Sequence, residues 1–170
     1  MVIWNRSFPR PERAKPILLA AALALAGCGG GGAWQTVTGD GFRFAAPTGW
    51  TVRQTDSRLS ASRGGVALVE VQRFRLVRPY RSTLFTAAAR ELDRVTAEIA
   101  RELHGQVAAG TTVQVAGMAA RSYRVAYGKL VEEITFLLDE RREYELLCRR
   151  AATAGEGLCA RFLSSFALTG

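Results

Sequence analysis

The longest periodic pattern in the chain covers residues 82–103, where apolar residues recur at steps of three and four. This spacing places the apolar residues on one face of an α-helix, and charged residues fill the opposite face. Ser82 can cap the first turn and Gly105 ends the pattern. Acids and bases are evenly mixed on the polar face, which favours a helix that packs on a sheet over one that lies on a membrane.

Alternating and continuous apolar segments on both sides of this helix predict an antiparallel sheet. Pro47 and Gly49 predict a turn that joins two short strands into a hairpin. The strands before the helix are predicted at residues 42–44, 50–54, 58–62 and 66–77. Those after it are predicted at residues 111–115, 119–127, 130–138 and 142–149. With a second amphipathic helix over residues 156–166, the chain is predicted to be α+β, with a mainly antiparallel sheet, one long helix and a C-terminal helix.

The first 27 residues differ in composition from the rest of the chain. Four basic residues precede an apolar stretch of ten residues from 17 to 26, and four glycines follow at 29–32. Ten apolar residues are too few to cross a bilayer as a helix, which takes roughly 20. A basic segment, a short apolar stretch and small residues, in that order, are typical of a secretory signal peptide.

The apolar stretch ends in Leu25, Ala26, Gly27 and Cys28, which resemble a bacterial lipobox. The resemblance implies cleavage before Cys28, whose sulfur then carries a lipid with enough acyl chains for stable anchoring. An ordinary secretory signal with an incidental cysteine is the alternative. We therefore predict a signal peptide at 1–27, a lipidated cysteine and glycine-rich linker at 28–33, and one domain at 34–170. This predicts a domain held on the extracytoplasmic face of the cell membrane.

The charge balance changes once this leader is set aside. The chain has 23 Lys and Arg against 15 Asp and Glu, and the leader holds four of these bases and one of these acids, which leaves 19 against 14 and a net charge of +5. An excess of positive charge favours an anionic membrane surface nearby. Because the bases are spread along the chain and the expected compartment is extracytoplasmic, we predict no nucleic-acid partner.

A small group of arginines precedes the long helix: Arg73, Arg75, Arg78 and Arg81. Arg73 and Arg75 share a strand face because they are two residues apart. The four could form a basic patch that contacts anionic headgroups or an acidic partner. Ordinary solvated charge is the simpler explanation.

Two cysteines remain besides Cys28, and an even pair in an oxidising compartment predicts a disulfide. Cys148 ends the last strand and Cys159 lies near the start of the last helix. A bond between them would close a loop of about a dozen residues and contribute roughly 3 kcal/mol in the chain-entropy model. Two free buried thiols are the alternative. The chain has no Cys-x-x-Cys motif, which argues against a redox enzyme.

Motifs for catalysis or metal binding are missing from the sequence. The single histidine, His104, has no accompanying Gly-x-Ser-x-Gly motif. A zinc site takes three or four ligands, and neither His-x-x-x-His nor paired cysteines occur. Glu132 and Glu133 are adjacent on a predicted strand and so point to opposite faces, which prevents them from acting as a dyad. We therefore expect no enzymatic activity, no metal and no cofactor.

The chain also carries the motif Phe-x-Phe-x-x-Pro-x-Gly-Trp at residues 42–50 and a Ser-Phe ending at residues 165–166. Together with the order of elements, these motifs resemble the PsbP-like α/β/α sandwich found in small actinobacterial lipoproteins of the LpqN/LpqT type. The resemblance covers residues 34–170 and implies an accessory, assembly or binding protein without shared catalytic residues.

Three functions follow as expectations. The first is a non-catalytic, lipid-anchored accessory protein that binds another envelope protein. The alternative is a carrier that holds a lipid or a small hydrophobic ligand in a pocket between sheet and helix, lined by Trp50, Tyr123 or Tyr127. An unrecognised hydrolase ranks last because the chain offers so few groups that could act as a base.

Overall fold

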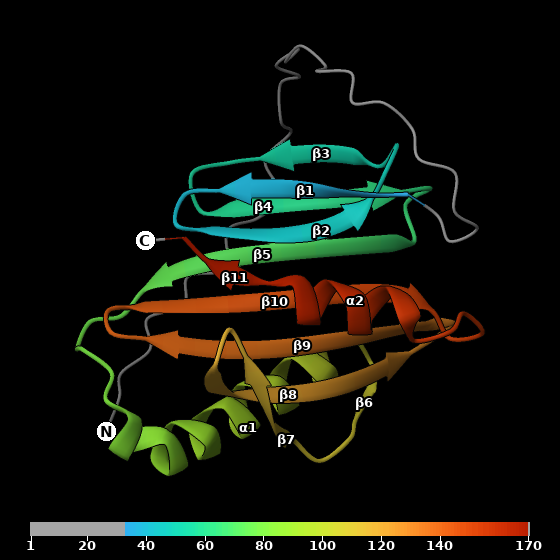
Figure 1. The fold of residues 1–170 in the computed structure, drawn as a ribbon. Coiled ribbons are helices and arrows are strands. Elements are labelled where there is room, and N and C mark those ends of the chain that lie inside the picture. Colours follow the sequence, from blue (N-terminus) through green and yellow to red (C-terminus); the bar gives the residue numbers. More distant parts are fainter. Residues whose placement is uncertain (1–32, 170) are drawn as a thin grey trace.

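The computed structural model describes residues 33–169, which form two sheets and two α-helices (Figure 1). The smaller sheet has three antiparallel strands, β1 (Trp34–Gly39), β2 (Phe42–Pro47) and β11 (Ala167–Leu168), in the order β1-β2-β11. The larger sheet contains β3 (Thr51–Gln54), β4 (Arg58–Arg63), β5 (Ala67–Arg75), β6 (Gln106–Val107), β7 (Thr111–Val115), β8 (Met118–Tyr127), β9 (Leu130–Asp139) and β10 (Arg142–Ala151). Its order is β3-β4-β5-β10-β9-β8-β6, and β7 also pairs with β8.

The two faces of the larger sheet are covered by different elements. The smaller sheet and α2 (Gly157–Ser165) pack on one face, where Phe44 and Phe162 meet edge to face with ring centroids 5.2 Å apart. The helix α1 (Phe85–Glu102) packs on the other face, where Leu92 lies in a second cluster with Tyr123 and Phe136. Because strand side chains alternate, β9 supplies Leu137 to the first core and Phe136 to the second. The α+β class with a mainly antiparallel sheet is confirmed.

One predicted pairing is wrong. Residues 50–54 were expected to form a hairpin with residues 42–44, but β2 pairs with β1, and β3 pairs with β4 in the other sheet. Gly49, with a left-handed φ of 81°, lies in the turn that leads the chain out of the smaller sheet. The strand β1 was missed because Val37 is its one buried residue, so its sequence shows no clear alternation.

The start of the long helix also differs from the prediction. Ser82 is the first residue of a 3₁₀ turn, Ser82–Leu84, and no side chain caps either this turn or α1, which begins at Phe85. The apolar stripe is placed as expected, but its buried positions include Thr96, whose hydroxyl donates to the carbonyl of Leu92 at 2.9 Å. This hydrogen bond satisfies a polar group in the second core.

The helix α1 ends in a turn at His104 that is closed by two backbone hydrogen bonds. The N–H of His104 donates to the carbonyl of Arg101 at 3.1 Å, and the N–H of Gly105 donates to that of Ala100 at 2.8 Å. This is a Schellman motif, and His104 takes the left-handed position with a φ of 52°. Gly105 is needed for another reason, because a Cβ there would lie 2.7 Å from the carbonyl oxygen of Ala126.

Replacing His104 with glycine is expected to raise the free energy of unfolding by about 1 kcal/mol, because glycine adopts this left-handed conformation without steric cost. The matched change at the next position, Gly105→Ala, should destabilise the domain, because its methyl group would collide with the backbone of β8. Urea unfolding of both variants beside the unmodified protein measures the two effects. An unchanged or lower midpoint in His104→Gly would contradict this account of the turn.

A disulfide joins the last helix to the larger sheet. Cys148 on β10 and Cys159 on α2 are bonded, with their Cα atoms 5.5 Å apart. Both residues are 2% exposed and belong to the first core. The predicted pairing is confirmed, and its burial marks it as structural rather than as an accessible redox site.

Candidate functional site

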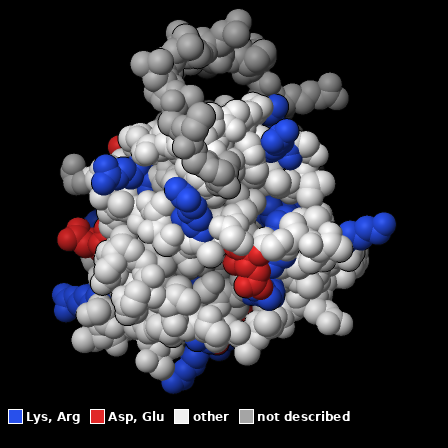
Figure 2. All heavy atoms as spheres, turned by 45° about the vertical axis from the view of Figure 1, so that its right-hand side comes forward, with Lys and Arg blue, Asp and Glu red and all other residues white. Residues whose placement is uncertain are grey.

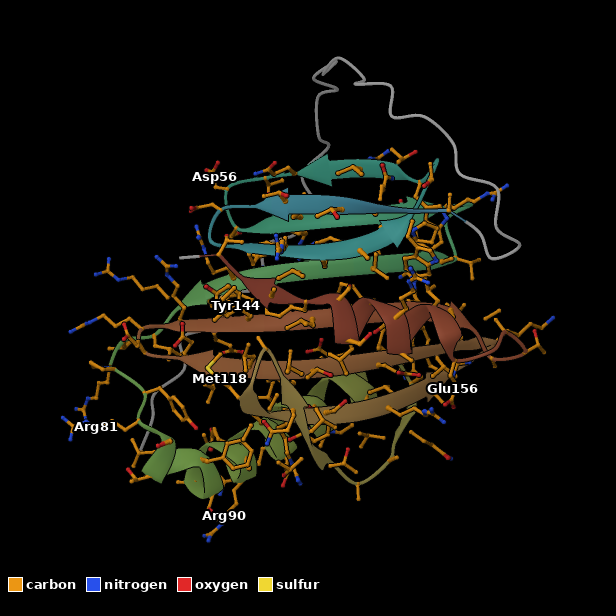
Figure 3. All side chains as sticks on the ribbon, in the orientation of Figure 1. Asp56, Arg81, Arg90, Met118, Tyr144 and Glu156 are labelled. Carbon is orange, nitrogen blue, oxygen red and sulfur yellow. A yellow bond between two sulfur atoms is a disulfide. The ribbon has the colours of Figure 1, made fainter. Side chains whose placement is uncertain are left out.

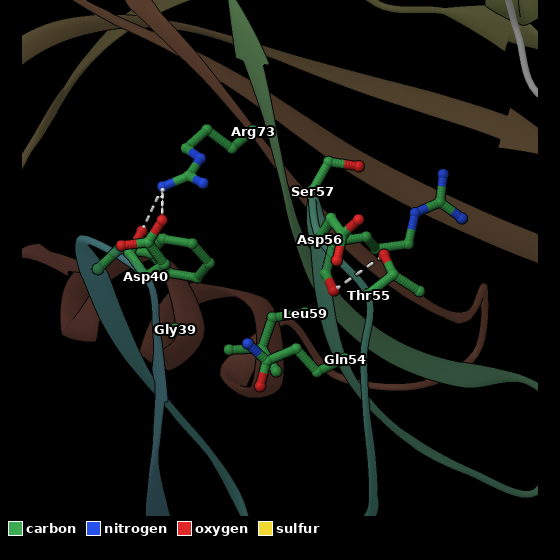
Figure 4. Close-up of a pocket in the computed structure, with 10 residues that line it drawn as sticks. Gly39, Asp40, Gln54, Thr55, Asp56, Ser57, Leu59 and Arg73 are labelled. Carbon is green, nitrogen blue, oxygen red and sulfur yellow. Dashed lines mark hydrogen bonds and ion pairs between the residues drawn. The ribbon is translucent and has the colours of Figure 1, made fainter. Parts of the chain in front are cut away.

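An open cleft of about 470 Å³ lies at one end of the larger sheet. We call this end the Asp40 end, because it holds the β1–β2 turn with Asp40, the β3–β4 turn, the last residues of β5 and the β9–β10 turn. Its lining residues are Asp40, Asp56, Ser57, Arg73, Phe74, Arg75, Arg141 and Arg142. Figure 4 shows the adjoining hollow, where Asp40 and Arg73 face the turn that carries Asp56 and Ser57.

The cleft brings together residues that are far apart in the sequence. Arg73 and Arg75 lie at the end of β5 and share one face of the strand. Arg141 lies in the β9–β10 turn, and Arg142 is the first residue of β10, which pairs with β5. With four arginines against two aspartates, the lining carries a net positive charge. Guanidinium groups present several N–H donors in a planar fork, which suits carboxylate and phosphate groups.

Two of these arginines face each other directly. Arg75 and Arg142 are partners in the register of β5 and β10. Like charges in opposite positions of an antiparallel pair destabilise a sheet. Within the described part of the chain, neither guanidinium forms an ion pair. The pKa of Arg142 is raised, first by its hydrogen bond with Tyr144 and then by the nearby Tyr144, Asp40 and Asp139. Arginine keeps its proton in proteins, so two positive charges face each other in the cleft.

Arg73 is held in a different way from the other arginines of the cleft. Its Nη1 lies 2.7 Å from Oδ2 of Asp40 and donates to the backbone oxygen of Asp40, also at 2.7 Å. This pair ties the β1–β2 turn of the smaller sheet to β5 of the larger one. The next residue, Gly41, has a left-handed φ of 82°. Its lack of a side chain leaves room for Arg142, because a Cβ at Gly41 would lie 3.1 Å from Nη1 of that arginine. Arg73 therefore shapes the cleft, while Arg75, Arg141 and Arg142 line it without an ion pair to any residue that the structure describes.

The structure brings two of the four arginines singled out in the sequence into the cleft. Arg73 and Arg75 line it, whereas Arg78 and Arg81 are exposed in the segment between β5 and α1. Figure 3 places Arg81 at the same end of the molecule, below the cleft. Sequence reasoning did not group Arg141 or Arg142 with these arginines, although it placed Arg142 at the start of the last strand. Cys28 lies outside the described residues.

The adjacent acids Glu132 and Glu133 point to opposite faces of β9, as predicted. Glu132 accepts a hydrogen bond from the hydroxyl of Tyr127 at 2.6 Å, and Glu133 pairs with Arg150 at 3.3 Å. Burial, followed by this hydrogen bond to Glu132, raises the pKa of Tyr127 to about 12. Each acid has its own partners, so the two do not act as a catalytic pair.

A second polar network ties α1 to the larger sheet. The hydroxyl of Tyr123 donates to Oδ1 of Asp93 at 2.6 Å, and Arg121 donates to the same atom through Nε and Nη2 at 3.1 and 3.0 Å. Burial acts to raise the pKa of Asp93, but the hydrogen bonds from Tyr123 and Arg121 and the charge of Arg121 outweigh it and lower this pKa. Asp93 is therefore more favourable as an anion in the folded domain than in the unfolded chain.

Acid should weaken the domain partly through Asp93. A carboxyl whose pKa is lowered by folding stabilises the fold above its unfolded pKa, and this contribution disappears as the pH falls through the folded pKa. Asp93→Asn should therefore lose less stability than the unmodified protein between about pH 5 and pH 2. Urea unfolding at several pH values tests this, with Glu98→Gln on the solvent side of α1 as the control. If the free energy of unfolding falls equally with pH in Asp93→Asn and in the unmodified protein, this role of Asp93 is contradicted.

The three aromatic residues expected to line a carrier pocket do not share one site. Trp50 packs against the core under α2, while Tyr123 and Tyr127 belong to the core under α1. The larger sheet lies between them. In the described residues no group of three or more His, Cys, Asp and Glu side chains is placed to hold a metal ion. Across residues 33–169, no helix combines the length and apolar character needed to cross a membrane.

Comparison with known proteins places the fold. No family model and no curated protein sequence matches the chain. The solution structure of cyanobacterial PsbP (CyanoP) from Synechocystis sp. PCC 6803 superposes with a TM-score of 0.60 at 15% identity, covering 85% of this chain and 99% of that one. This chain has a PsbP-like fold. A crystal structure of a Bacteroides thetaiotaomicron VPI-5482 protein gives a TM-score of 0.53 at 6% identity over 76% of this chain, which spans 45% of that protein.

The aromatic motifs that suggested the PsbP-like fold have a structural role. Phe42 stacks on Phe166 with ring centroids 6.0 Å apart, and Phe44 meets Phe162. The opening and closing segments of the PsbP-like domain therefore pack against each other in the first core. These aromatic residues fill the interior between the smaller sheet, α2 and the larger sheet.

Proposed function

We propose that this PsbP-like domain is a non-catalytic binding protein of the cell envelope, and that its cleft at the Asp40 end binds an acidic segment of another envelope protein. The observation that carries the proposal is the pair Arg75 and Arg142. These two like charges lie directly opposite each other, and neither forms an ion pair within the described residues. Such a pair weakens the fold, and an anion bound between the two guanidinium groups would relieve the repulsion.

The position of the cleft favours a protein over lipid headgroups as the partner. The proposed lipid on Cys28 and the residues 29–33 can span at most about 17 Å before Trp34. The strand β1 then runs from Trp34 to Gly39, next to Asp40. Six residues of strand cover about 20 Å, so the cleft lies a strand's length beyond the point where the anchored linker joins the domain. Figure 1 shows the start of β1 and the β1–β2 turn at opposite ends of the strands.

The chemistry of the lining residues supports binding rather than catalysis. Arginine keeps its proton in proteins, so it acts as a donor and does not exchange protons with a substrate. Asp40, one of the two acids that line the cleft, is already held by Arg73. The lining offers shape and charge for an extended acidic segment, and its four arginines provide the donors.

Native mass spectrometry of the full-length protein, extracted gently from its own membranes, tests this proposal. We expect a bound protein that is lost from the double variant Arg75→Gln, Arg142→Gln. The matched control is Arg78→Gln, Arg81→Gln, which removes the same charge outside the cleft and should keep the partner. A partner retained by the cleft variant would contradict the proposal. A bound lipid mass in place of a protein would favour the carrier alternative.

A further inference from the structure

The opposite end of the sheets, which we call the Trp34 end, has its own surface chemistry. It contains the start of β1 and the turns 47–50, 63–66 and 128–129. The carbonyl of Ala33 accepts a hydrogen bond from the N–H of Thr48 at 2.8 Å, which fixes the start of β1 to the first of these turns. The chain that leads back to Cys28 therefore leaves the domain at this end.

Two half-buried tryptophans mark the Trp34 end. The guanidinium of Arg161, on α2, lies 4.6 Å from the ring centre of Trp34, so a positive charge is stacked on an aromatic face at the surface. Trp50 follows in the turn after β2, where its backbone N–H donates to the carbonyl of Pro47 at 3.4 Å. Tryptophan side chains with one apolar and one polar edge concentrate at the level of lipid headgroups.

Exposed basic side chains also lie at the Trp34 end, in α2 and in the turns 63–66 and 128–129. Arg63, Lys129 and Arg161 are exposed, and none of them forms an ion pair with any residue that the structure describes. The acid at this end, Glu156, is already occupied by Arg124 and Arg150. In Figure 2 this side of the molecule is turned forward, and basic side chains outnumber acidic ones across it.

We propose that the Trp34 end is a membrane-contact surface for anionic lipid. Trp34 and Trp50 lie at headgroup level, and Arg63, Lys129 and Arg161 contact lipid phosphates. The strands of both sheets then stand upright on the membrane, and the arginine cleft faces away from it. This inference rests on the proposed anchoring at Cys28, because a linker of at most about 17 Å keeps this end near the headgroups.

Tryptophan fluorescence of the lipid-anchored, full-length protein tests the orientation. Removal of the leader takes Trp4 with it, so Trp34 and Trp50 are the tryptophans that remain. Trp50→Phe isolates the signal of Trp34, and Trp34→Phe isolates that of Trp50. In vesicles of bromine-labelled phosphatidylglycerol, we expect each signal to fall by about half relative to unlabelled lipid, because bromine quenches indoles at headgroup and upper acyl depth.

Charge variants separate this surface from the cleft. Arg63→Gln, Lys129→Gln and Arg161→Gln together should reduce the quenching, whereas Arg75→Gln with Arg142→Gln should leave it unchanged. Mass spectrometry of the same sample shows whether Cys28 carries a lipid. No quenching in a protein with lipidated Cys28 overturns the membrane-contact surface and leaves the proposed partner binding intact. A mature protein without this lipid overturns the anchoring and the orientation drawn from it.

Discussion

The variant Arg75→Gln, Arg142→Gln should bind the acidic partner about a hundredfold more weakly and yet be at least as stable as the unmodified protein. Each guanidinium can contribute charge-assisted hydrogen bonds to a carboxylate, and hydrogen bonds to charged groups contribute about 1.5–3 kcal/mol each. In the free domain the same two side chains repel each other across β5 and β10. Their removal should therefore raise the free energy of unfolding by a few tenths of a kcal/mol.

Two comparisons make this result interpretable. Arg78→Gln, Arg81→Gln carries the same change of net charge outside the cleft and should alter binding little. Arg73→Gln is unsuitable as a first variant, because it would also break the pair with Asp40 that holds the β1–β2 turn. Titration of the partner in buffers of rising salt, together with urea unfolding of each variant, measures both quantities. A cleft variant that is less stable and binds normally would contradict the assignment.

The second large effect concerns the disulfide. The double variant Cys148→Ala, Cys159→Ala should lower the free energy of unfolding by about 3 kcal/mol, because the bond closes a loop of about a dozen residues in the unfolded chain. It also fastens α2 to β10, where both sulfur atoms are buried in the first core. Alanine is the better replacement here, since serine would bury a hydroxyl without a partner.

Urea unfolding of the double variant measures this effect, and Cys28→Ala serves as the control because it leaves the pair intact. The unmodified protein should resist mild reductant until it unfolds, since both cysteines are 2% exposed. A loss of less than about 1 kcal/mol would mean that the core holds α2 without the bond. Ready reduction of the folded protein would contradict its burial.

Local patterns in the sequence were enough to find most of the elements. The helix at 82–103, the meander at 111–149 and the final helix follow from periodicity, because each buries a regular stripe or face. Shorter elements gave no such signal. β1 buries a single residue, Val37, and β6 and β11 have two residues each. Their places depend on pairing with strands distant in the sequence.

The candidate site was harder to predict than the fold. Arg73 and Arg75 could be grouped, because two residues on one strand share a face. Their meeting with Arg141 and Arg142 depends on the pairing of β5 with β10, which a helix and four strands separate along the chain. The disulfide was predicted from the number of cysteines and the expected oxidising compartment, because setting Cys28 aside for the predicted lipid leaves two cysteines and one possible bond.

The most direct test of the account places a photo-reactive amino acid at one end or the other of the full-length protein in its own cells. Ser57 lines the cleft, and Thr48 is the matched exposed position at the Trp34 end. The account predicts a crosslink to one envelope protein from Ser57, its loss in the background Arg75→Gln, Arg142→Gln, and no such crosslink from Thr48. A protein crosslink of equal yield from Thr48, or a Ser57 crosslink that survives the loss of both arginines, would contradict it.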